Sequence, residues 1–252
     1  LMLKNLKLRN KILLAVCTVV ALVFTLVMGI LLQRFYGYAE SEAYKLAGEV
    51  AGKYSSAVQS RIELAMQAAR SMAVMFESAA QHPERTNRDL LDEQMQNLLK
   101  SNPMFFGIWV TFEANALDGR DGEYINHNGT HGEDGRYAPY FFRSGDEIEG
   151  TYSPSEESDE YYTVPKTTGR EMLVNPYYDE EVAKQMATVA VPILKEGRVL
   201  GVVGIDIVLD YFQSLIAEIK PFETGYGFLV GNDGTLVAHP REEFLSKNLG
   251  DV

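Results

Sequence analysis

The pattern of hydrophobic positions changes several times along this chain, and it begins with an uncharged apolar run at residues 12–32. An α-helix needs about 20 apolar residues to cross the hydrocarbon core of a bilayer, so this run is long enough to span a membrane. Four basic residues precede the run: Lys4, Lys7, Arg9 and Lys11. Because basic flanks stay in the cytoplasm, we expect a cytoplasmic segment at 1–11, a transmembrane helix at 12–32 and an exported region from about residue 33.

A cleaved signal peptide is the alternative interpretation of this run. Signal peptides have an apolar core of about 7–15 residues, which ends at a cleavage site made of small residues. The apolar run here ends in Leu31 and Leu32, followed by Gln33 and Arg34, and has no such site. The sequence therefore favours a retained membrane anchor.

A helical period follows the anchor. Apolar side chains recur every three or four residues at Ala43, Ala47, Val50, Tyr54, Val58, Ile62, Ala65, Ala69, Met72 and Phe76. One apolar stripe of this kind predicts a long amphipathic helix over residues 33–81. Such a helix can act as a stalk and as the contact surface of a homodimer, or it can pack along its own domain, and we expect both.

A second helix and several strands are predicted next. Thr86 or Asn87 can cap a helix that ends near Ser101, with an inner face of Leu90, Leu91, Met95, Leu98 and Leu99. From Phe105 the period changes to that of strands, which we expect at 105–113, 137–143, 186–194 and 199–208. A glycine-rich loop separates the first two, and the tetrapeptide 195–198 joins the last two as a hairpin.

The last part of the sequence predicts another small unit. An amphipathic helix is expected from Leu209 to Ile219, followed by short strands at 225–230 and 235–238 around a turn at Asn232-Asp233-Gly234. These residues are too few for a whole domain. We therefore expect residues 220–252 to begin a second module that is incomplete here, with a further membrane crossing beyond Val252.

Charge and cysteine content narrow the possible functions. The formal net charge is −12, and all 35 acidic residues follow Gln33, which disfavours nucleic acid as a partner and mildly favours small cationic ligands. General solubility is an equally good account of this charge. The single cysteine, Cys17, lies in the apolar run, so it supplies no disulfide framework and no exported nucleophile. No catalytic motif is present, and we expect neither an enzyme nor a metal or cofactor.

Five local motifs, in this order, resemble one family. They are WVTFEANALDG at 109–119, YYTVPK at 161–166, PYYD at 176–179, GVVGIDI at 201–207 and GYGFLV at 225–230. The chain resembles the double Cache (dCache) sensor domain, which forms the periplasmic part of bacterial methyl-accepting chemotaxis proteins and of some sensor kinases and diguanylate cyclases. The resemblance implies an α+β fold with two PAS-like modules of antiparallel sheet on one long helix. The membrane-distal module, at 82–219, would hold the ligand.

The resemblance also implies a set of ligand-binding residues. In amino-acid-sensing members, an Arg and a Trp-Tyr pair hold the ligand carboxylate, while a Tyr-x-Asp motif and a strand Asp hold its ammonium group. Here Tyr177 and Asp179 match the Tyr-x-Asp motif, and Asp206 matches the strand Asp. Trp109 and Tyr140 are further candidates, although aromatic residues at strand spacing are also typical of a core.

The carboxylate-binding half of the pattern differs. Tyr161-Tyr162 stands in place of Trp-Tyr, and Asp159 in place of the Arg. Since like charges repel, Asp159 cannot hold a ligand carboxylate, and Lys166 or Arg170 would have to substitute. We therefore expect a ligand with a cationic amine and no obligatory carboxylate.

The sequence thus predicts the ligand-sensing region of an inner-membrane chemoreceptor. The expected partners are a small amine or amino acid, a second copy of the chain along the long helix, the membrane, and cytoplasmic signalling proteins reached through a missing C-terminal part. A sensor kinase or cyclase, an amino-acid sensor, and a structural or adhesive surface protein are the alternatives.

Overall fold

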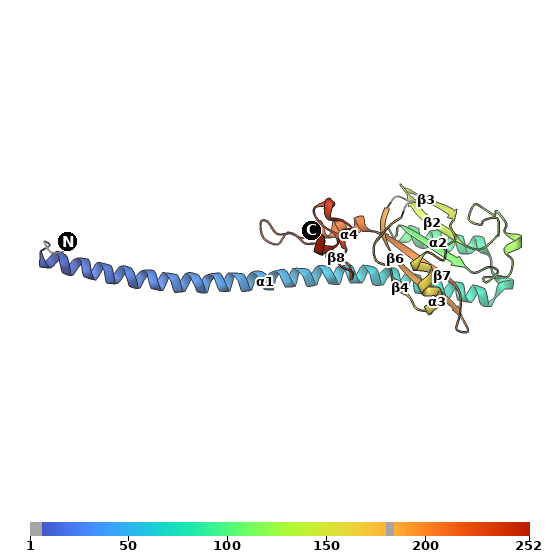
Figure 1. Cartoon of the computed structure of the whole chain (residues 1–252). Helices are drawn as coiled ribbons and strands as arrows, with labels where there is room; N and C mark the ends of the chain where they lie inside the picture. Colours follow the sequence, from blue (N-terminus) through green and yellow to red (C-terminus); the bar gives the residue numbers. More distant parts are fainter. Residues whose placement is uncertain (1–6, 180–183) are drawn as a thin grey trace. The chain divides into compact units, whose positions relative to one another are not determined.

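The structure is a computed structural model that describes residues 7–179 and 184–252. It divides into two compact units, Leu1–Gly52 and Lys53–Val252, which are described separately. Helix α1, Leu8–Gln81, carries residues of both units (Figure 1). In the first unit α1 contains an 18-residue window with a mean hydropathy of 2.8 and no buried residue. By length and composition this helix can cross a membrane, as expected for residues 12–32.

In the second unit α1 contributes one face to a hydrophobic core. The predicted apolar stripe is buried at Val58, Ala65, Ala69, Met72 and Phe76. The Phe76 ring packs edge-on against Phe112 at 5.7 Å between centroids. From residue 58 onward, the stripe therefore packs inside its own domain, which is one of the two roles expected of it.

Helix α2, Arg88–Ser101, lies beside α1, and Met72 and Met95 line a groove between the two helices (Figure 1). A short 3-10 turn, Pro83–Arg85, connects them. Asn87 caps α2 by accepting a hydrogen bond from Leu90 N at 3.3 Å, as predicted. The predicted inner face was wrong at Leu90, which is 50% exposed, because Arg88 and Asp92 are buried there together with Leu91, Met95 and Leu99.

Among the described residues, seven strands form one antiparallel sheet. In sheet order they are β3 (Glu147–Tyr152), β2 (Pro139–Ser144), β1 (Gly107–Phe112), β7 (Arg198–Val208), β6 (Lys184–Lys195) and β4 (Met172–Leu173), while β5 (Tyr177–Asp179) also pairs with β6. The predicted β6–β7 hairpin is confirmed. Its turn residues Glu196 and Gly197 have φ values of 52° and 80°, the left-handed conformation that two-residue hairpin turns need.

Strand alternation determines which side chains share a face of this sheet. Cross-strand partners point to the same side, and Trp109 pairs with Tyr140 and Gly204, while Asp206 pairs with Gly107 and Thr188. Ile108, Val110 and Phe112 point to the other side, where Phe112 meets Phe76. One face therefore packs on the long helices, and the other carries Trp109, Tyr140, Thr188 and Asp206.

Helix α3, Glu160–Thr168, covers the second face over β6 and β7. It ends at Gly169, whose φ of 65° fits a left-handed helix C-cap. Neither α3 nor the strands β3, β4 and β5 were predicted from the sequence. They are short, and their apolar residues show no sustained period.

The C-terminal elements follow the prediction with shorter strands. Helix α4, Leu209–Ala217, buries Leu209, Phe212 and Ile216. Strands β8 (Leu229–Val230) and β9 (Leu236–Ala238) form a separate two-stranded sheet around the predicted turn. Short 3-10 turns occur at Asp121–Glu123, Glu242–Phe244 and Leu249–Asp251. The boundary near residue 220 between two modules stays a prediction.

Candidate functional site

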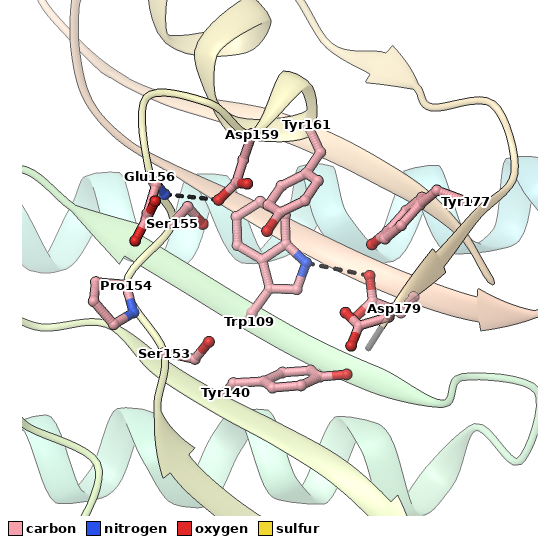
Figure 2. A pocket seen from close by; sticks show the side chains of 11 residues that line it. Trp109, Tyr140, Ser153, Pro154, Ser155, Glu156, Asp159, Tyr161, Tyr177 and Asp179 are labelled. Atoms are coloured by element: carbon pink, nitrogen blue, oxygen red, sulfur yellow. Dashed lines mark hydrogen bonds between the residues drawn. The ribbon is translucent and has the colours of Figure 1, made fainter. Parts of the chain in front are cut away.

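A cavity of about 350 Å³ lies on the sheet face that α3 covers (Figure 2). It brings together seven of the nine residues proposed from the sequence: Trp109, Tyr140, Asp159, Tyr161, Tyr177, Asp179 and Asp206. The remaining lining residues are Ser153, Pro154, Ser155 and Glu156. Residues from β1, β2, β5, β7, α3 and the segment before α3 therefore meet in one place, although they are far apart in sequence.

Asp206 lies at the base of the cavity and is only 2% exposed. Its Oδ1 atom accepts hydrogen bonds from Trp109 Nε1 at 3.2 Å and from Thr188 Oγ1 at 2.6 Å. Thr188 is its cross-strand partner on β6, so the register of the sheet sets this contact. Both donors point at the same oxygen, which leaves Oδ2 on the other side of the carboxylate.

A hydrogen-bond chain fixes the orientation of Tyr177. The Thr188 hydroxyl has one hydrogen, which it donates to Asp206, so at 2.9 Å it accepts from Tyr177 Oη. The Tyr177 hydroxyl thus donates its own hydrogen to a group of the protein. It faces the cavity as a hydrogen-bond acceptor, a suitable partner for an ammonium group.

The hydroxyl of Tyr140 is buried without a hydrogen-bond partner among the described residues, and the residue is only 6% exposed. Gly107 makes room for it, because a Cβ at this position would lie 2.7 Å from Tyr140 Oη and 3.0 Å from Asp206 Oδ2. A buried hydroxyl of this kind costs free energy unless something binds it. The Asp206 carboxylate is the polar group beside this hydroxyl at the base of the cavity.

Aromatic rings form the sides of the cavity. Tyr161, the first of the Tyr pair on α3, lies over Trp109 with ring centroids 5.2 Å apart. Tyr177 stacks on Tyr161 at 5.9 Å. Gly204 allows the indole to lie flat on β7, since a Cβ there would come within 2.2 Å of the ring. Electron-rich faces arranged in this way attract organic cations.

The charge of the cavity is negative. Glu156, Asp159, Asp179 and Asp206 are among the lining residues, and no Lys, Arg or His is found among the described residues that line it. Burial raises the pKa of Asp206 to about 6, against the hydrogen bonds it accepts, and nearby Asp179 adds to the rise. Burial and the neighbouring Asp206 also raise the pKa of Tyr140. Among the described residues that line the cavity, no cationic group compensates Asp206.

Tyr162 and Lys166 do not line this cavity. They line a neighbouring hollow with Glu113 and Arg136, because successive residues on a helix point about 100° apart. The Tyr162 hydroxyl donates to Glu113, and Lys166 pairs with Glu113 at 2.9 Å and Glu157 at 2.6 Å. Lys166 therefore does not supply the positive charge that Asp159 replaces.

Sequence reasoning missed the segment that leads into α3. Ser155 is held by Thr111, whose Oγ1 accepts from Ser155 N at 3.2 Å. Thr111 is a polar residue on the cavity face of β1. Its presence in an otherwise apolar strand is the one sequence signal that a polar segment packs on that face. Which segment crosses is a tertiary result that the sequence pattern does not contain.

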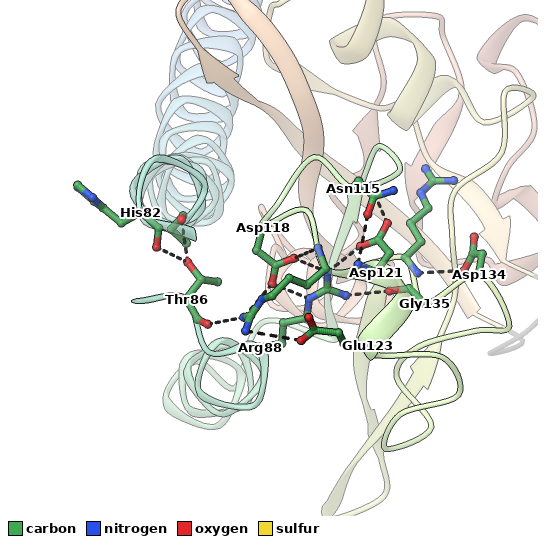
Figure 3. Close-up of polar contacts among 12 residues, drawn as sticks. His82, Thr86, Arg88, Asn115, Asp118, Asp121, Glu123, Asp134 and Gly135 are labelled. Atoms are coloured by element: carbon green, nitrogen blue, oxygen red, sulfur yellow. Dashed lines mark hydrogen bonds and ion pairs between the residues drawn. The ribbon is translucent and has the colours of Figure 1, made fainter. Parts of the chain in front are cut away.

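A second acidic cluster lies around Arg88 and was also missed (Figure 3). Arg88 is fully buried, and its Nη2 donates to Asp118 Oδ1 and Asp121 Oδ1, each at 2.6 Å. Its Nη1 donates to Gly135 O at 2.8 Å, and its guanidinium lies 4.3 Å from the Tyr124 ring centroid. Every part of this cation is used inside the protein, so the cluster is structural.

Comparison with known proteins identifies the family. The sequence matches the dCache_1 family, described as Cache domain, over residues 37–251. The chain belongs to this family. Methyl-accepting chemotaxis proteins of Pseudomonas aeruginosa are among its relatives. TlpQ is 33% identical over 144 residues, covering 51% of this chain and 20% of TlpQ. PctB is 28% identical over 255 residues, covering 100% of this chain and 35% of PctB. The chain thus spans about a fifth to a third of these relatives.

Solved structures agree with this assignment. The extracellular domain of the putative histidine kinase mmHK1S-Z3 is similar with a TM-score of 0.75 and 31% identity, covering 83% of this chain and 75% of that one. Methyl-accepting chemotaxis protein X has a TM-score of 0.66 and 28% identity, covering 79% and 76%. The predicted family and α+β fold are confirmed. The Cache domain is a ligand-binding sensor domain rather than an enzyme, as the sequence indicated.

Proposed function

We propose that this Cache domain is the periplasmic sensor of a transmembrane chemoreceptor and that it binds a small amine-bearing ligand in the cavity around Trp109. The observation that carries the proposal is the lining of the cavity, which combines four carboxylates with four aromatic rings and has no cationic side chain among its described residues. Charge-assisted hydrogen bonds to carboxylates are among the strongest polar contacts, and aromatic faces add cation–π attraction.

The same lining disfavours a ligand carboxylate. Amino-acid-sensing members of the family have an Arg at this position. This chain has Asp159 there instead, and Asp159 lines the cavity. The nearest candidate to replace that Arg, Lys166, is occupied by Glu113 and Glu157. An amino acid remains the second candidate because Tyr177, Asp179 and Asp206 keep the ammonium half of the pattern.

Signalling would follow from differential affinity. A ligand shifts an equilibrium between two arrangements only as far as it binds one of them better. Here the ligand would shift a homodimer formed along α1, and the membrane-spanning part of α1 would pass the change to cytoplasmic signalling partners. A histidine kinase is the alternative output, favoured by the likeness to mmHK1S-Z3. The proposal places residues from about 33 onward in the periplasm.

Thermal-shift measurements test the ligand class on the full chain in detergent. The probes are alkyl amines, L-amino acids and alkyl carboxylates. A ligand at a hundred times its Kd adds about 2.7 kcal/mol, which raises the midpoint by roughly 5–10 °C for a domain of this size. We expect amines to raise the midpoint in the native chain and to fail in the variants Asp179→Ala and Asp206→Ala.

The variant Asp146→Asn is the matched control, since it removes an exposed carboxylate in the β2–β3 turn, outside the cavity. It should keep the full shift. A midpoint raised by L-amino acids or carboxylates and not by amines would contradict the proposed ligand class.

A further inference from the structure

We infer that Glu113 is a positioning residue of the cavity around Trp109, although it is not among the residues that line it. The inference rests on the proposed function and concerns how the same cavity is held in shape. Glu113 directly follows β1, and its carboxylate binds Tyr162 and Lys166 of α3. Through these two side chains it keeps Tyr161, the neighbour of Tyr162, against the Trp109 ring.

Helix α3 depends on contacts outside itself for its position. It has nine residues, whereas isolated helices shorter than about 12–15 residues are marginal in water. Pro165 lies inside it and donates no backbone hydrogen bond, and Asp159 at its N-cap makes no side-chain capping bond. The buried side chains of α3 are those of Tyr162 and Pro165, and only Tyr162 carries a polar group. Its hydroxyl therefore has a large influence on where the helix lies.

Glu113 provides the fixed point on the sheet. Its backbone N–H donates to Leu200 O of β7 at 2.8 Å, which continues the pairing of β1 with β7. Trp109 lies earlier on the same strand. Burial would raise the pKa of the Glu113 carboxyl, but the hydrogen bonds from Tyr162 and Lys166 outweigh it and lower the value. Glu113 is therefore an anion at neutral pH, held in a set place relative to the indole.

Two side chains of α3 meet on one oxygen of Glu113. Tyr162 Oη donates to Oε1, and Lys166 Nζ pairs with the same atom at 2.9 Å. The two residues are spaced i, i+4 on the helix, so they share one face. Arg136 Nη2 donates to Tyr162 Oη at 3.2 Å, which leaves the hydroxyl hydrogen for Glu113. Since Tyr162 is only 1% exposed, water does not replace these contacts.

The same contacts determine where Tyr161 lies. Its ring lies over Trp109 at 5.2 Å between centroids and stacks on Tyr177 at 5.9 Å. Neighbouring residues of a helix have a fixed spacing and angle, so a displacement of Tyr162 also displaces Tyr161. An aromatic wall of the cavity thus depends on a contact that is made outside the cavity.

Lys166 holds a further part of the wall. Besides Glu113, it pairs with Glu157 at 2.6 Å, in the segment that leads into α3. Glu157 directly follows Glu156, which lines both the cavity and the neighbouring hollow. The Lys166 and Glu157 side chains are 26% and 74% exposed, and exposed ion pairs contribute little. We therefore expect the buried contact of Tyr162 with Glu113 to be the stronger of the two.

Acrylamide quenching of tryptophan fluorescence tests the inference without a ligand. Trp109 is the one tryptophan of the chain, it is 6% exposed, and Tyr161 covers it. We expect Glu113→Ala and Tyr162→Phe to raise the quenching constant of the full chain in detergent several-fold, with unchanged far-UV circular dichroism. Glu113→Gln, whose amide oxygen can still accept from Tyr162, should restore part of the protection.

Tyr152→Phe and Glu63→Ala are the matched controls. Tyr152 donates its hydroxyl to Asp134 at 2.8 Å, and Glu63 pairs with Arg70 at 2.8 Å, both outside the cavity lining. Neither control should change the quenching. Titration with 1-aminobutane then connects the contact to binding: Glu113→Ala should weaken the affinity about tenfold, and the controls should leave it unchanged.

The other outcomes separate the positioning role from the proposed function. Unchanged quenching in both Glu113→Ala and Tyr162→Phe would overturn the positioning role, whatever the amine does. An equal increase in the controls would also overturn it, because the change would not be specific to this contact. Increased quenching in the two variants, with no amine binding by the native chain, would support the positioning role and overturn the proposed function. If Glu113→Ala does not fold, as judged by circular dichroism, Tyr162→Phe decides the question.

Discussion

Two groups of buried acids in this domain differ in what balances their charge. Around Arg88, the carboxylates of Asp118 and Asp121 meet a guanidinium that is itself fully buried. Around Trp109, Asp206 is just as deeply buried and accepts hydrogen bonds from neutral donors, among them the Trp109 N–H and the Thr188 hydroxyl. The first group is complete within the chain, whereas the second has space beside it and no internal cation among the described residues.

The pKa values of the two groups show the same difference. Burial would raise the pKa of Asp118, but the hydrogen bonds from Arg88 outweigh it and lower the value. Burial raises the pKa of Asp206 to about 6 because its neutral donors do not outweigh the loss of water. A buried charge without a counter-charge is costly to the folded state. The Arg88 cluster therefore serves stability, whereas the Asp206 cluster is the one that we propose for binding a cation from outside.

The largest expected effect is the loss of Arg88. Replacing Arg88 by Met leaves Asp118 and Asp121 buried without a cation, which should lower the free energy of unfolding by about 3–5 kcal/mol. Urea unfolding of the full chain in detergent, followed by circular dichroism, measures this. A loss below 1 kcal/mol would show that the two clusters do not differ in the way described here.

Asp206→Asn should affect ligand binding rather than stability, in contrast to the loss of Arg88. The Asn side-chain oxygen can still accept from Trp109 and Thr188, while the uncompensated charge is gone. We expect unchanged or higher stability without ligand, and amine binding weakened by about 100-fold, equivalent to about 2.7 kcal/mol. The chain contains one tryptophan, and it lies in the cavity, so titration by intrinsic fluorescence measures the affinity. Full affinity in this variant would remove Asp206 from the site.

The pH dependence of binding follows from Asp206. Its pKa in the free protein is about 6, and an ammonium ligand needs the ionised carboxylate. Affinity should therefore fall about tenfold between pH 7 and pH 5, while the amine stays protonated throughout. The effect of pH on folding without ligand is the opposite. Burial raises the pKa of Asp206 in the folded state, so the folded state binds this proton more tightly than the unfolded chain does. Asp206 therefore adds to the free energy of unfolding as the pH falls below about 6. The same titrations with Asp206→Asn should show no such fall in affinity.

The smallest effect is expected at an exposed ion pair. Arg70 of α1 donates to Glu171 and to Glu63, and all three side chains are in contact with solvent. Exposed pairs contribute little, since water solvates the separated charges. Arg70→Met should leave the urea midpoint nearly unchanged, in contrast to Arg88→Met. A midpoint lowered as far as in Arg88→Met would contradict burial as the cause of the difference.

Part of this site could be predicted from sequence because it depends on local order. Strand alternation and the family motifs identified Trp109 and Asp206, and the sheet register brings them together. The Tyr pair was found, but the choice of Tyr161 over Tyr162 depends on the orientation of α3, a helix that was not predicted. Lys166 is one turn further along the same helix and faces the neighbouring hollow for the same reason.

Other parts depend on contacts between distant residues. Glu156 belongs to an acidic stretch whose default interpretation is a solvated surface, but it lines the cavity, next to Ser155, which is held by Thr111. The burial of Arg88 could not be predicted from the sequence, because a basic residue in the first turn of a helix normally faces water. Its partners Asp118 and Asp121 come from a glycine-rich loop that has no periodic pattern.

The central claim is that the Asp206 cluster receives its counter-charge from a ligand. A crystal structure of the chain grown with a short alkyl amine tests it most directly. The account predicts an ammonium nitrogen within hydrogen-bond distance of Asp206 Oδ2 and Tyr140 Oη, with the hydrocarbon chain along Trp109. An amine bound elsewhere, or a cavity that takes a carboxylate against Asp159 in its place, would contradict it.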